Sequence, residues 1–403
     1  MIIRLKQSNI DFLIRLIYIA IPLTFPLAMI SGLFMGPWIG LIMVMVICVS
    51  KAEISAIKSY FMPHEHILML WGIFSCAWSI SPIESIMISS QLIFVIIMSH
   101  ILTNKTNIFV DKTKNLIKRI TIGILAAAII FSIEAFTDGM FYRLVRGVVQ
   151  PNSNGHFEYS WLDKGCSVLS VSTWALIYLL VKARKKIRAL ILYSAIFILL
   201  LASDSTASFV AFILGGIAYL AVYFSPRIMA FLLALSVIAY MIIMPIFSLK
   251  QDPREITSEY KKIPISYAHR LFIWNFTAEK SMENPFIGKG IGSSKLVPVL
   301  DSDIVPYLHY NLSPLPRHPH NNILQIWLEM GAIGLVIAGT YIWNILAQLR
   351  VISRKNNNFG AAIHAVFINY FFIGMVSFNI WQSWWMMVAL FMVLLMNIVR
   401  HNE

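Results

Sequence analysis

Three ionisable side chains crowd into four residues directly before a long apolar run. In "RHPHNNILQIWLEMGAIG" (317–334) they are Arg317, His318 and His320. A proline and two asparagines also precede the run, so we expect a helix to begin near 320–323. A histidine there lies at the positive end of the helix dipole, which favours the neutral imidazole near pH 7. His320 is therefore a candidate general base, and a plain helix cap at a membrane surface is the alternative.

Two glycines follow this histidine at helical spacing. Gly331 and Gly334 come 11 and 14 residues after His320, which places all three near one face of a continuous helix. Glycines on that face let another helix or a lipid tail approach closely, so we predict a helix-packing role for both. Glu329 falls on the opposite face, and we do not expect it to orient His320.

An upstream segment offers groups that suit a phosphate. The stretch "ISYAHRLFIWNFTAEKSMEN" predicts an amphipathic helix, with an apolar stripe of Leu271, Trp274, Ala278 and Met282. It carries Arg270, whose planar fork of donors suits phosphate oxygens, although a solvated surface charge is the alternative.

The next segment, "GKGIGSS" (288–294), lacks the spacing of a nucleotide-binding P-loop. It predicts a flexible turn that ends the helix before it, with Lys289 a candidate phosphate contact.

The metal-binding signals are weak. His318 and His320 form an H-x-H pattern, but no nearby carboxylate or cysteine completes a site, so we expect no metal. Cys48, Cys76 and Cys166 lie in or beside apolar segments and suggest neither a zinc motif nor disulfides.

Composition places these groups in a membrane protein. The 403 residues are 58% hydrophobic and only 13% charged, with a mean hydropathy of +0.74. The apolar runs do not alternate with polar residues, which argues against a β-barrel. We therefore predict an all-α integral membrane protein. The charged residues Glu134, Asp204 and Glu329 fall in or near apolar runs and are functional candidates by default, the first two close to span ends.

We predict about twelve transmembrane helices. Residues 1–249 hold the first nine and residues 322–403 the last three, and residues 250–321 form a large, partly helical outer loop. The predicted spans are 12–32, 35–50, 66–81, 83–102, 120–137, 165–182, 188–203, 206–224, 228–249, 322–349, 361–380 and 383–399.

The charge distribution predicts the orientation. Most of the 32 lysines and arginines fall on the short segments of one side, whereas the short segments of the other side hold only Arg143, Arg146 and Lys164. This positive-inside bias puts both termini in the cytoplasm and the long loop outside. The net charge of +13 is then a signal of topology and of contact with anionic lipids, and nucleic-acid binding is not expected.

The motif resembles that of a known family. "HNNILQIWLEMGAIG" is similar to the H-[N/S/Q]-x9-G-x2-G pattern of the bacterial O-antigen ligase family, with His320, Asn321, Gly331 and Gly334 at the motif positions. The stretch "HRLFIWNFTAEKSMENPFIGKGIG" resembles that family's R…W…P…G-x-G segment. The specific resemblance covers about 195–345.

The resemblance implies a large multi-spanning (GT-C-like) glycosyltransferase that works without metal or cofactor and inverts the anomeric centre. Its donor would be a glycan on undecaprenyl diphosphate and its acceptor the lipid A-core. The reaction would take place on the periplasmic face of the inner membrane, in lipopolysaccharide biosynthesis.

The resemblance also assigns residue roles. His320 corresponds to the family base and Arg270 to a diphosphate-binding arginine. Arg317 and Lys289 are further candidates for stabilising the leaving anion, and His318 and Asn321 are candidate substrate contacts.

A second family arginine is missing here. "ASDSTASF" has Thr206 where that arginine is expected, and Lys164, Arg143 or Arg146 are possible substitutes.

Two groups of alternatives remain open. An O-antigen polymerase or a protein O-oligosaccharyltransferase would share the donor and differ in the acceptor. A transporter of lipid-linked glycans would instead place polar groups along a path through the spans, whereas this sequence concentrates them in the outer loop.

Overall fold

The computed structural model describes residues 7–50, 63–104, 113–137, 139–146, 162–259 and 263–400, and these are mostly helical. The helices are α1 (Gln7–Ile30), α2 (Met35–Ser50), α4 (Pro63–Ser75), α5 (Pro82–Asn104), α6 (Thr113–Phe136), α7 (Met140–Arg146), α8 (Asp163–Lys182), α9 (Lys186–Leu201), α10 (Thr206–Phe224), α11 (Pro226–Lys250), α12 (Pro253–Glu259), α13 (Ile265–Ser281), α14 (Asn322–Lys355), α15 (Asn357–Val376) and α16 (Ser383–Arg400). A small antiparallel hairpin joins β1 (Val305–Tyr307) to β2 (Tyr310–Leu312).

The predicted all-α, multi-pass membrane fold is confirmed. Within the described residues, nine helices are long and apolar enough to cross a bilayer. The predicted spans 35–50, 66–81 and 188–203 form α2, α4 and α9, which have only 16, 13 and 16 residues. Helices of that length reach about 20–24 Å, short of a hydrocarbon core of about 30 Å.

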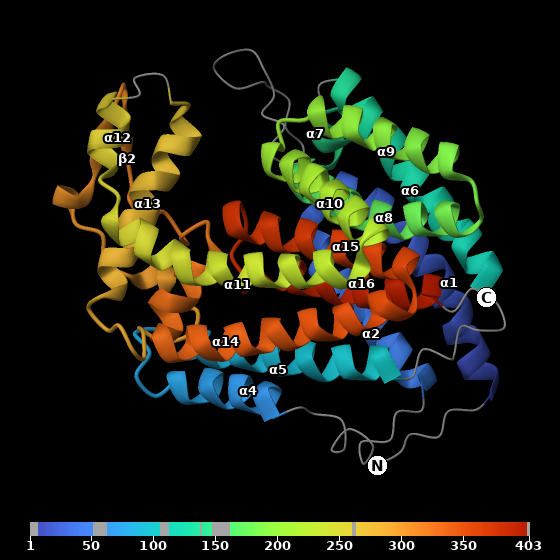
Figure 1. The fold of residues 1–403 in the computed structure, drawn as a ribbon, viewed down its shortest axis with the longest axis horizontal. Helices are drawn as coiled ribbons and strands as arrows, with labels where there is room; N and C mark the ends of the chain where they lie inside the picture. Colours follow the sequence, from blue (N-terminus) through green and yellow to red (C-terminus); the bar gives the residue numbers. More distant parts are fainter. Residues whose placement is uncertain are drawn as a thin grey trace.

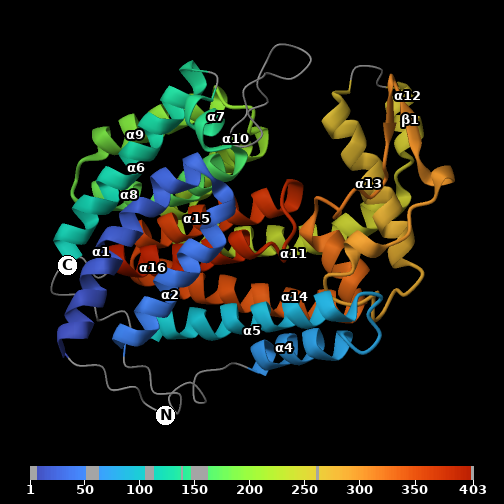
Figure 2. The ribbon, with the colours of Figure 1, turned by 180° about the vertical axis from the view of Figure 1, so that it is seen from behind.

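The long helices lie side by side and carry a separate lobe at one end (Figure 1). In this bundle α11 packs against α14, and α15 packs against α10, α8 and α14. The view from behind shows α12, α13 and the hairpin grouped at one end of α11 and α14 (Figure 2). The outer loop predicted for residues 250–321 therefore contains this lobe.

The helix predicted around Arg270 exists as α13, and part of the predicted stripe is buried. Ala278 is fully buried and Trp274 packs against the core, together with Ala268, Phe272 and Phe276, which the stripe did not include. Met282 is about half exposed, because α13 ends at Ser281 and Met282 is no longer part of the helix.

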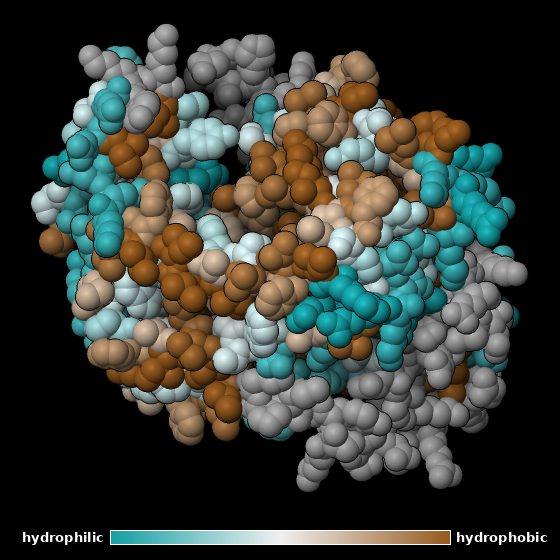
Figure 3. Space-filling view, in the orientation of Figure 1, coloured by the Kyte–Doolittle hydropathy of each residue, from teal (hydrophilic) through white to brown (hydrophobic). Residues whose placement is uncertain are grey.

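The outer surface of the bundle is apolar. Ile242, Ile243 and Ile246 on α11 and Val336 on α14 are all exposed. Figure 3 shows hydrophobic side chains along this part of the molecule and hydrophilic ones on the lobe. Exposed apolar side chains on long helices are what a lipid-facing surface requires.

Candidate functional site

The backbone holds His320 in one orientation. Its Nδ1 lies 2.8 Å from the carbonyl oxygen of Ser377, just beyond the end of α15. A carbonyl only accepts, so Nδ1 must carry the proton, and in the neutral ring Nε2 then keeps its lone pair. His320 also has a φ of 50°, a left-handed conformation that costs energy for a non-glycine residue. The structure thus leaves Nε2 as the atom that can accept a proton.

His318 supports this turn. Its Nδ1 accepts the backbone N–H of His320 at 3.1 Å, and the two ring centroids are 4.1 Å apart. Because Nδ1 accepts, the neutral His318 ring carries its proton on Nε2. Burial lowers the pKa of His318 to about 3, with help from His320 and Arg317. His318 therefore acts as a neutral donor and as a support for the turn.

His320 is neutral at pH 7, as predicted, but mainly for a different reason. Burial is the largest cause that lowers its pKa, to about 4. The Ser377 carbonyl opposes this shift, whereas the nearby Arg270 and His269 reinforce it. Desolvation penalises the charged ring more than the bond to Ser377 rewards it, so the ring is available as a base.

Arg270 is anchored beside His320. Its Nε donates to the carbonyl of Val376 at 3.0 Å, and its Nη1 donates to Ser266 at 2.9 Å. Val376 and Ser377 are consecutive, and their carbonyls at the end of α15 would otherwise lack helical partners. The structure therefore brings Arg270 and His320 together on neighbouring carbonyls. An arginine has five N–H donors, so two such bonds leave part of the fork for another acceptor.

The guanidinium of Arg270 is largely withdrawn from water. Burial lowers its pKa from the ordinary value, while Tyr267 and Asp163 act in the opposite direction. An anion that reached Arg270 would meet a poorly hydrated cation, where charge-assisted hydrogen bonds are strong. The space-filling view is hollowed between the α13 lobe and the helices around α10 (Figure 3).

Asp163 was not among the predicted site residues. It is the first residue of α8 and is close enough to Arg270 for mutual electrostatic attraction. Its Oδ1 is buried and has no hydrogen-bond partner among the described residues. Its position at a helix start next to Lys164 gave no sequence signal, because its neighbourhood with α13 is created only by the fold.

The residues around the missing second arginine are placed as follows. Thr206 begins α10, and its backbone N–H donates to the carbonyl of Asp204. Lys164 lies next to Asp163, with its ammonium 5.6 Å from the ring centroid of Trp384. Arg143 donates to the carbonyl of Thr137. The side chain of Arg146 lies outside the described part of the chain.

Asn321 has a positioning role in the structure. Its Oδ1 accepts the N–H groups of Ile323 and Leu324, and its Nδ2 donates to Tyr240. It is therefore the N-cap of α14, which begins at Asn322, within the predicted range. A fully buried amide engaged at both ends fixes the start of α14 and so the place of His320.

The role of Gly331 differs from the prediction. It has φ 70° and ψ −175°, which breaks α14 instead of continuing it. A Cβ there would lie 2.1 Å from the carbonyl oxygen of Phe286. The expected partner, a helix or a lipid tail, is thus corrected to the backbone of the outer loop. The single helical face assumed for residues 320, 331 and 334 does not survive this break.

The loop satisfies the backbone groups that the break exposes. The N–H groups of Ala332 and Ile333 donate to Pro285 and Phe286. The carbonyls of Leu328 and Glu329 accept the N–H groups of 289 and 290. Such compensation is required where a helix unwinds in the interior of a protein, because a buried backbone N–H or C=O without a partner costs free energy. The carbonyl of 330 accepts from Trp71, which also contacts Gly334, so Gly334 does pack against another helix, α4.

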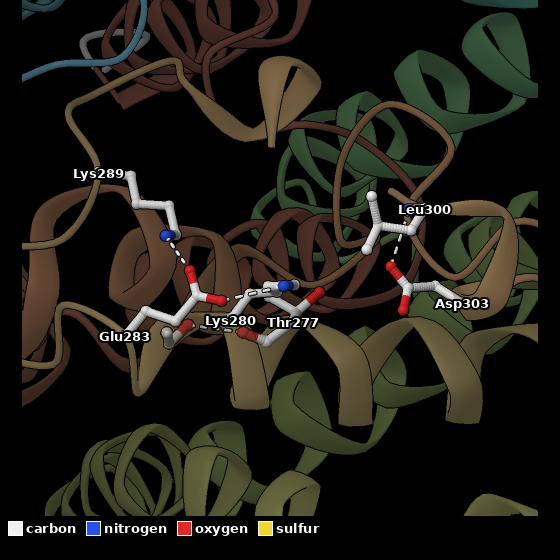
Figure 4. Close-up of polar contacts among 7 residues, drawn as sticks. Thr277, Lys280, Glu283, Lys289, Leu300 and Asp303 are labelled. Atoms are coloured by element: carbon white, nitrogen blue, oxygen red, sulfur yellow. Dashed lines mark hydrogen bonds and ion pairs between the residues drawn. The ribbon is translucent and has the colours of Figure 1, made fainter. Parts of the chain in front are cut away.

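Lys289 is paired with an acid. Its Nζ lies 2.5 Å from Glu283, which also binds Lys280 (Figure 4). These lysines lower the pKa of the Glu283 carboxyl. Lys289 is therefore committed to a carboxylate in this structure, while its backbone N–H holds the loop on α14.

Glu329 holds the loop from inside. Its Oε2 accepts Gly292 N–H at 2.6 Å and Trp381 Nε1 at 2.5 Å, and its Oε1 accepts Gln325 Nε2 at 3.0 Å and both donors of Ser294. This buried carboxylate joins α14 to the glycine-rich turn and to the α15–α16 connection. The prediction that Glu329 does not orient His320 directly agrees with these contacts.

The remaining charged candidates are structural or exposed. Glu134 is buried, and its Oε1 accepts the N–H of Phe141 in α7. Arg317 is exposed beside His318. In the part of the chain that the structure describes, no group of three or more His, Cys, Asp or Glu side chains could hold a metal ion.

These features define a multi-pass membrane protein in which His320 and Arg270 bind neighbouring backbone carbonyls at the end of α15. The O-Antigen ligase family model matches residues 168–339. The chain is similar to the "Putative polysaccharide ligase" of Rickettsia typhi (strain ATCC VR-144 / Wilmington), with 35% identity over 338 residues, 83% of this chain and 80% of the relative. It is similarly related to a protein of the same name from Rickettsia bellii (strain RML369-C), with 36% identity over 329 residues, 82% of this chain and 78% of the relative.

The chain therefore belongs to the O-antigen ligase family. Its class is a membrane enzyme of the ligase or glycosyltransferase type. No solved structure matches it significantly.

Proposed function

We propose that this protein transfers a glycan from undecaprenyl diphosphate to the lipid A-core, on the periplasmic face of the bacterial inner membrane. The observation that carries the proposal is the attachment of His320 and Arg270 to the consecutive carbonyls of Ser377 and Val376. A base and an anion-binding group held this way suit a reaction that removes a proton at one atom and releases an anion at another.

The reaction follows from these two groups. Nε2 of His320 takes the proton of an acceptor hydroxyl as its oxygen attacks the anomeric carbon of the donor. The bond from that carbon to the diphosphate oxygen breaks, and the electron pair leaves with the diphosphate. Arg270 stabilises the anion that forms, and the anomeric centre is inverted because attack comes from the opposite side. The proposal needs no metal for these steps.

The position in the membrane supports a lipid carrier. His320 and Arg270 lie where α14 begins and α15 ends, at the end of the bundle that carries the lobe (Figure 1). A polyprenyl tail could stay in the bilayer while its diphosphate reaches Arg270. The relatives' names support a polysaccharide substrate.

The test is to combine purified protein with undecaprenyl-diphosphate-linked glycan and lipid A-core. We expect lipid A-core that carries the glycan, together with one equivalent of undecaprenyl diphosphate. Transfer to a protein acceptor only, or polymerisation of the donor without modified lipid A-core, would contradict the proposed acceptor.

A further inference from the structure

A pocket with a volume of about 430 Å³ lies next to His318. Its walls combine Ile88, Gly292, Leu296 and Pro316 with the polar side chains of Glu84, Lys295, Arg317, His318, Asn379 and Gln382. These residues come from the start of α5, the outer loop and the α15–α16 connection, so the pocket opens at the same end of the bundle as His320. Arg270 is not part of its lining.

The polar side chains of the lining offer mainly hydrogen-bond donors and an excess of positive charge. Lys295 pairs with Glu84 at 2.7 Å, which leaves the exposed Arg317 as an added cation. The side-chain oxygen of Asn379 accepts from Trp381 and Gln325, and that of Gln382 accepts from Trp384. Their oxygens are thus turned to the protein, and their NH₂ groups are the donors left for a ligand.

Amide, carboxylate and cationic groups around a pocket suit the hydroxyls of a sugar that also carries a negative group. A phosphate or carboxylate on that sugar would match Arg317 and Lys295, which together exceed the single charge of Glu84. The Nε2–H of His318 adds a neutral donor to the same set.

The pocket adjoins His318, and Arg270 lies near His320. His318 lines the pocket, whereas His320 shares the end of α15 with Arg270. The centroids of the two rings are 4.1 Å apart, so the wall that His318 contributes to the pocket adjoins the ring of the candidate base. An inverting reaction needs the acceptor and the leaving group on opposite sides of the reacting carbon. An acceptor in the pocket and a diphosphate at Arg270 would occupy separate sites, as such a reaction needs.

We propose that this pocket binds the acceptor as an anionic saccharide, with Arg317 and Lys295 recognising its negative group and Gln382 its hydroxyls. The inference rests on the proposed function, because it assumes that Arg270 takes the donor diphosphate.

Binding is tested directly with a soluble probe. The probe is deacylated, phosphorylated core oligosaccharide, titrated calorimetrically into detergent-solubilised full-length protein, with the dephosphorylated form as its comparison. We expect Lys295→Gln and Arg317→Gln each to weaken binding of the phosphorylated form about tenfold, as expected for loss of one charge-assisted bond. Gln382→Ala should weaken both forms. Lys280→Gln, which alters a lysine paired with Glu283 outside the pocket, should change neither. Unchanged binding in all three pocket variants would overturn the proposal.

Steady-state transfer separates acceptor from donor. We expect Lys295→Gln and Gln382→Ala to raise KM for the acceptor about tenfold and KM for the donor less than twofold. A rise in the donor KM alone would assign the pocket to the donor glycan and overturn the proposal. A third outcome separates the two proposals: the wild-type protein binds the oligosaccharide, the variants do not, and the wild-type protein transfers no glycan to lipid A-core. That outcome would support saccharide binding in the pocket and contradict the proposed function.

Discussion

At the scale of single residues, the chemistry depends on which nitrogen of His320 is free. The Ser377 carbonyl fixes the proton on Nδ1, and burial keeps the ring neutral. Arg270 donates to the adjacent carbonyl of Val376, so the same end of α15 holds both side chains. Two residues 50 positions apart in sequence thus share one short piece of backbone.

The pKa of His320 predicts an unusual pH profile. A base must be deprotonated, and the His320 pKa is lowered to about 4, so kcat/KM should stay level as the pH falls through 6.5 and decline only near pH 4. The acidic decline of kcat should lie at higher pH than that of kcat/KM, because the negative charge of a bound diphosphate favours the protonated His320 ring. The measurement is transfer rate against pH with limiting donor. A decline of kcat/KM centred near 6.5 would indicate a solvent-exposed base.

Arg270 should not tolerate lysine. Arg270→Lys keeps the charge but loses the planar fork that can bind Val376 and a second acceptor together, so kcat/KM should fall at least about tenfold. Arg254→Lys, on the exposed surface of α12, is the matched control and should retain activity. Equal activity of the two variants would mean that only the charge of Arg270 matters.

At the scale of elements, the break of α14 at Gly331 and the glycine-rich turn at 288–294 depend on each other. Gly331 opens α14, and residues 285–290 occupy the opening. A Cβ at Gly288 would meet the backbone of Glu329 at 2.4 Å, so close backbone approach is needed from both sides. The loop that carries α13 and Arg270 is thereby fixed to the helix that begins beside His320.

Gly331→Ala should destabilise the protein by about 3 kcal/mol, because alanine disfavours φ 70° and its Cβ collides with Phe286. Gly339→Ala is the control in the same helix, where the Cβ would meet only Met241 at 3.7 Å. It should be neutral or slightly stabilising. Thermal unfolding in detergent measures both, and similar Tm values for the two variants would argue against the break.

Glu329→Gln should loosen the same junction. The carboxylate accepts every one of its hydrogen bonds, and an amide would present N–H groups to some of these donors. We expect a loss of about 1–3 kcal/mol and faster hydrogen exchange at 288–294. Exchange in α1, which packs against α2, α6 and α8, serves as the internal control. Uniform acceleration throughout the chain would indicate general destabilisation.

The sequence predicted some of this junction and not the rest. The start of α14 and the helix around Arg270 follow from local patterns. The neutral state of His320 was also predicted, but its main cause, burial, is created by the fold. The break at Gly331 was missed, because helical spacing was assumed to continue through an apolar run. Ser377 and Asp163 could not be found, since a backbone carbonyl has no sequence signature and Asp163 meets Arg270 only through tertiary packing.

At the scale of the whole molecule, the long helices carry an apolar surface and the lobe at one end carries a hydrophilic one. Hydropathy predicted nearly all the helices, because lipid-facing positions must be apolar. The spans predicted at 35–50, 66–81 and 188–203 are already short, at 16 residues each, and of these only α4 is shorter than predicted, at 13 residues.

Orientation is tested by labelling single cysteines with a membrane-impermeant maleimide, after Cys48, Cys76 and Cys166 are replaced by alanine. Tyr310→Cys on the lobe should react in intact spheroplasts. Lys185→Cys, in the exposed turn before α9, should react only after lysis. The reverse pattern would contradict a periplasmic site.

The most direct test of the central claim compares His320→Ala with His309→Ala in the reconstituted transfer reaction. His309 is an exposed histidine in the turn of the β-hairpin, which makes it a matched control. We predict that loss of the base at His320 lowers kcat at least about 100-fold, while His309→Ala stays near the wild-type rate. A folded His320→Ala variant that transfers glycan at the wild-type rate would contradict the account.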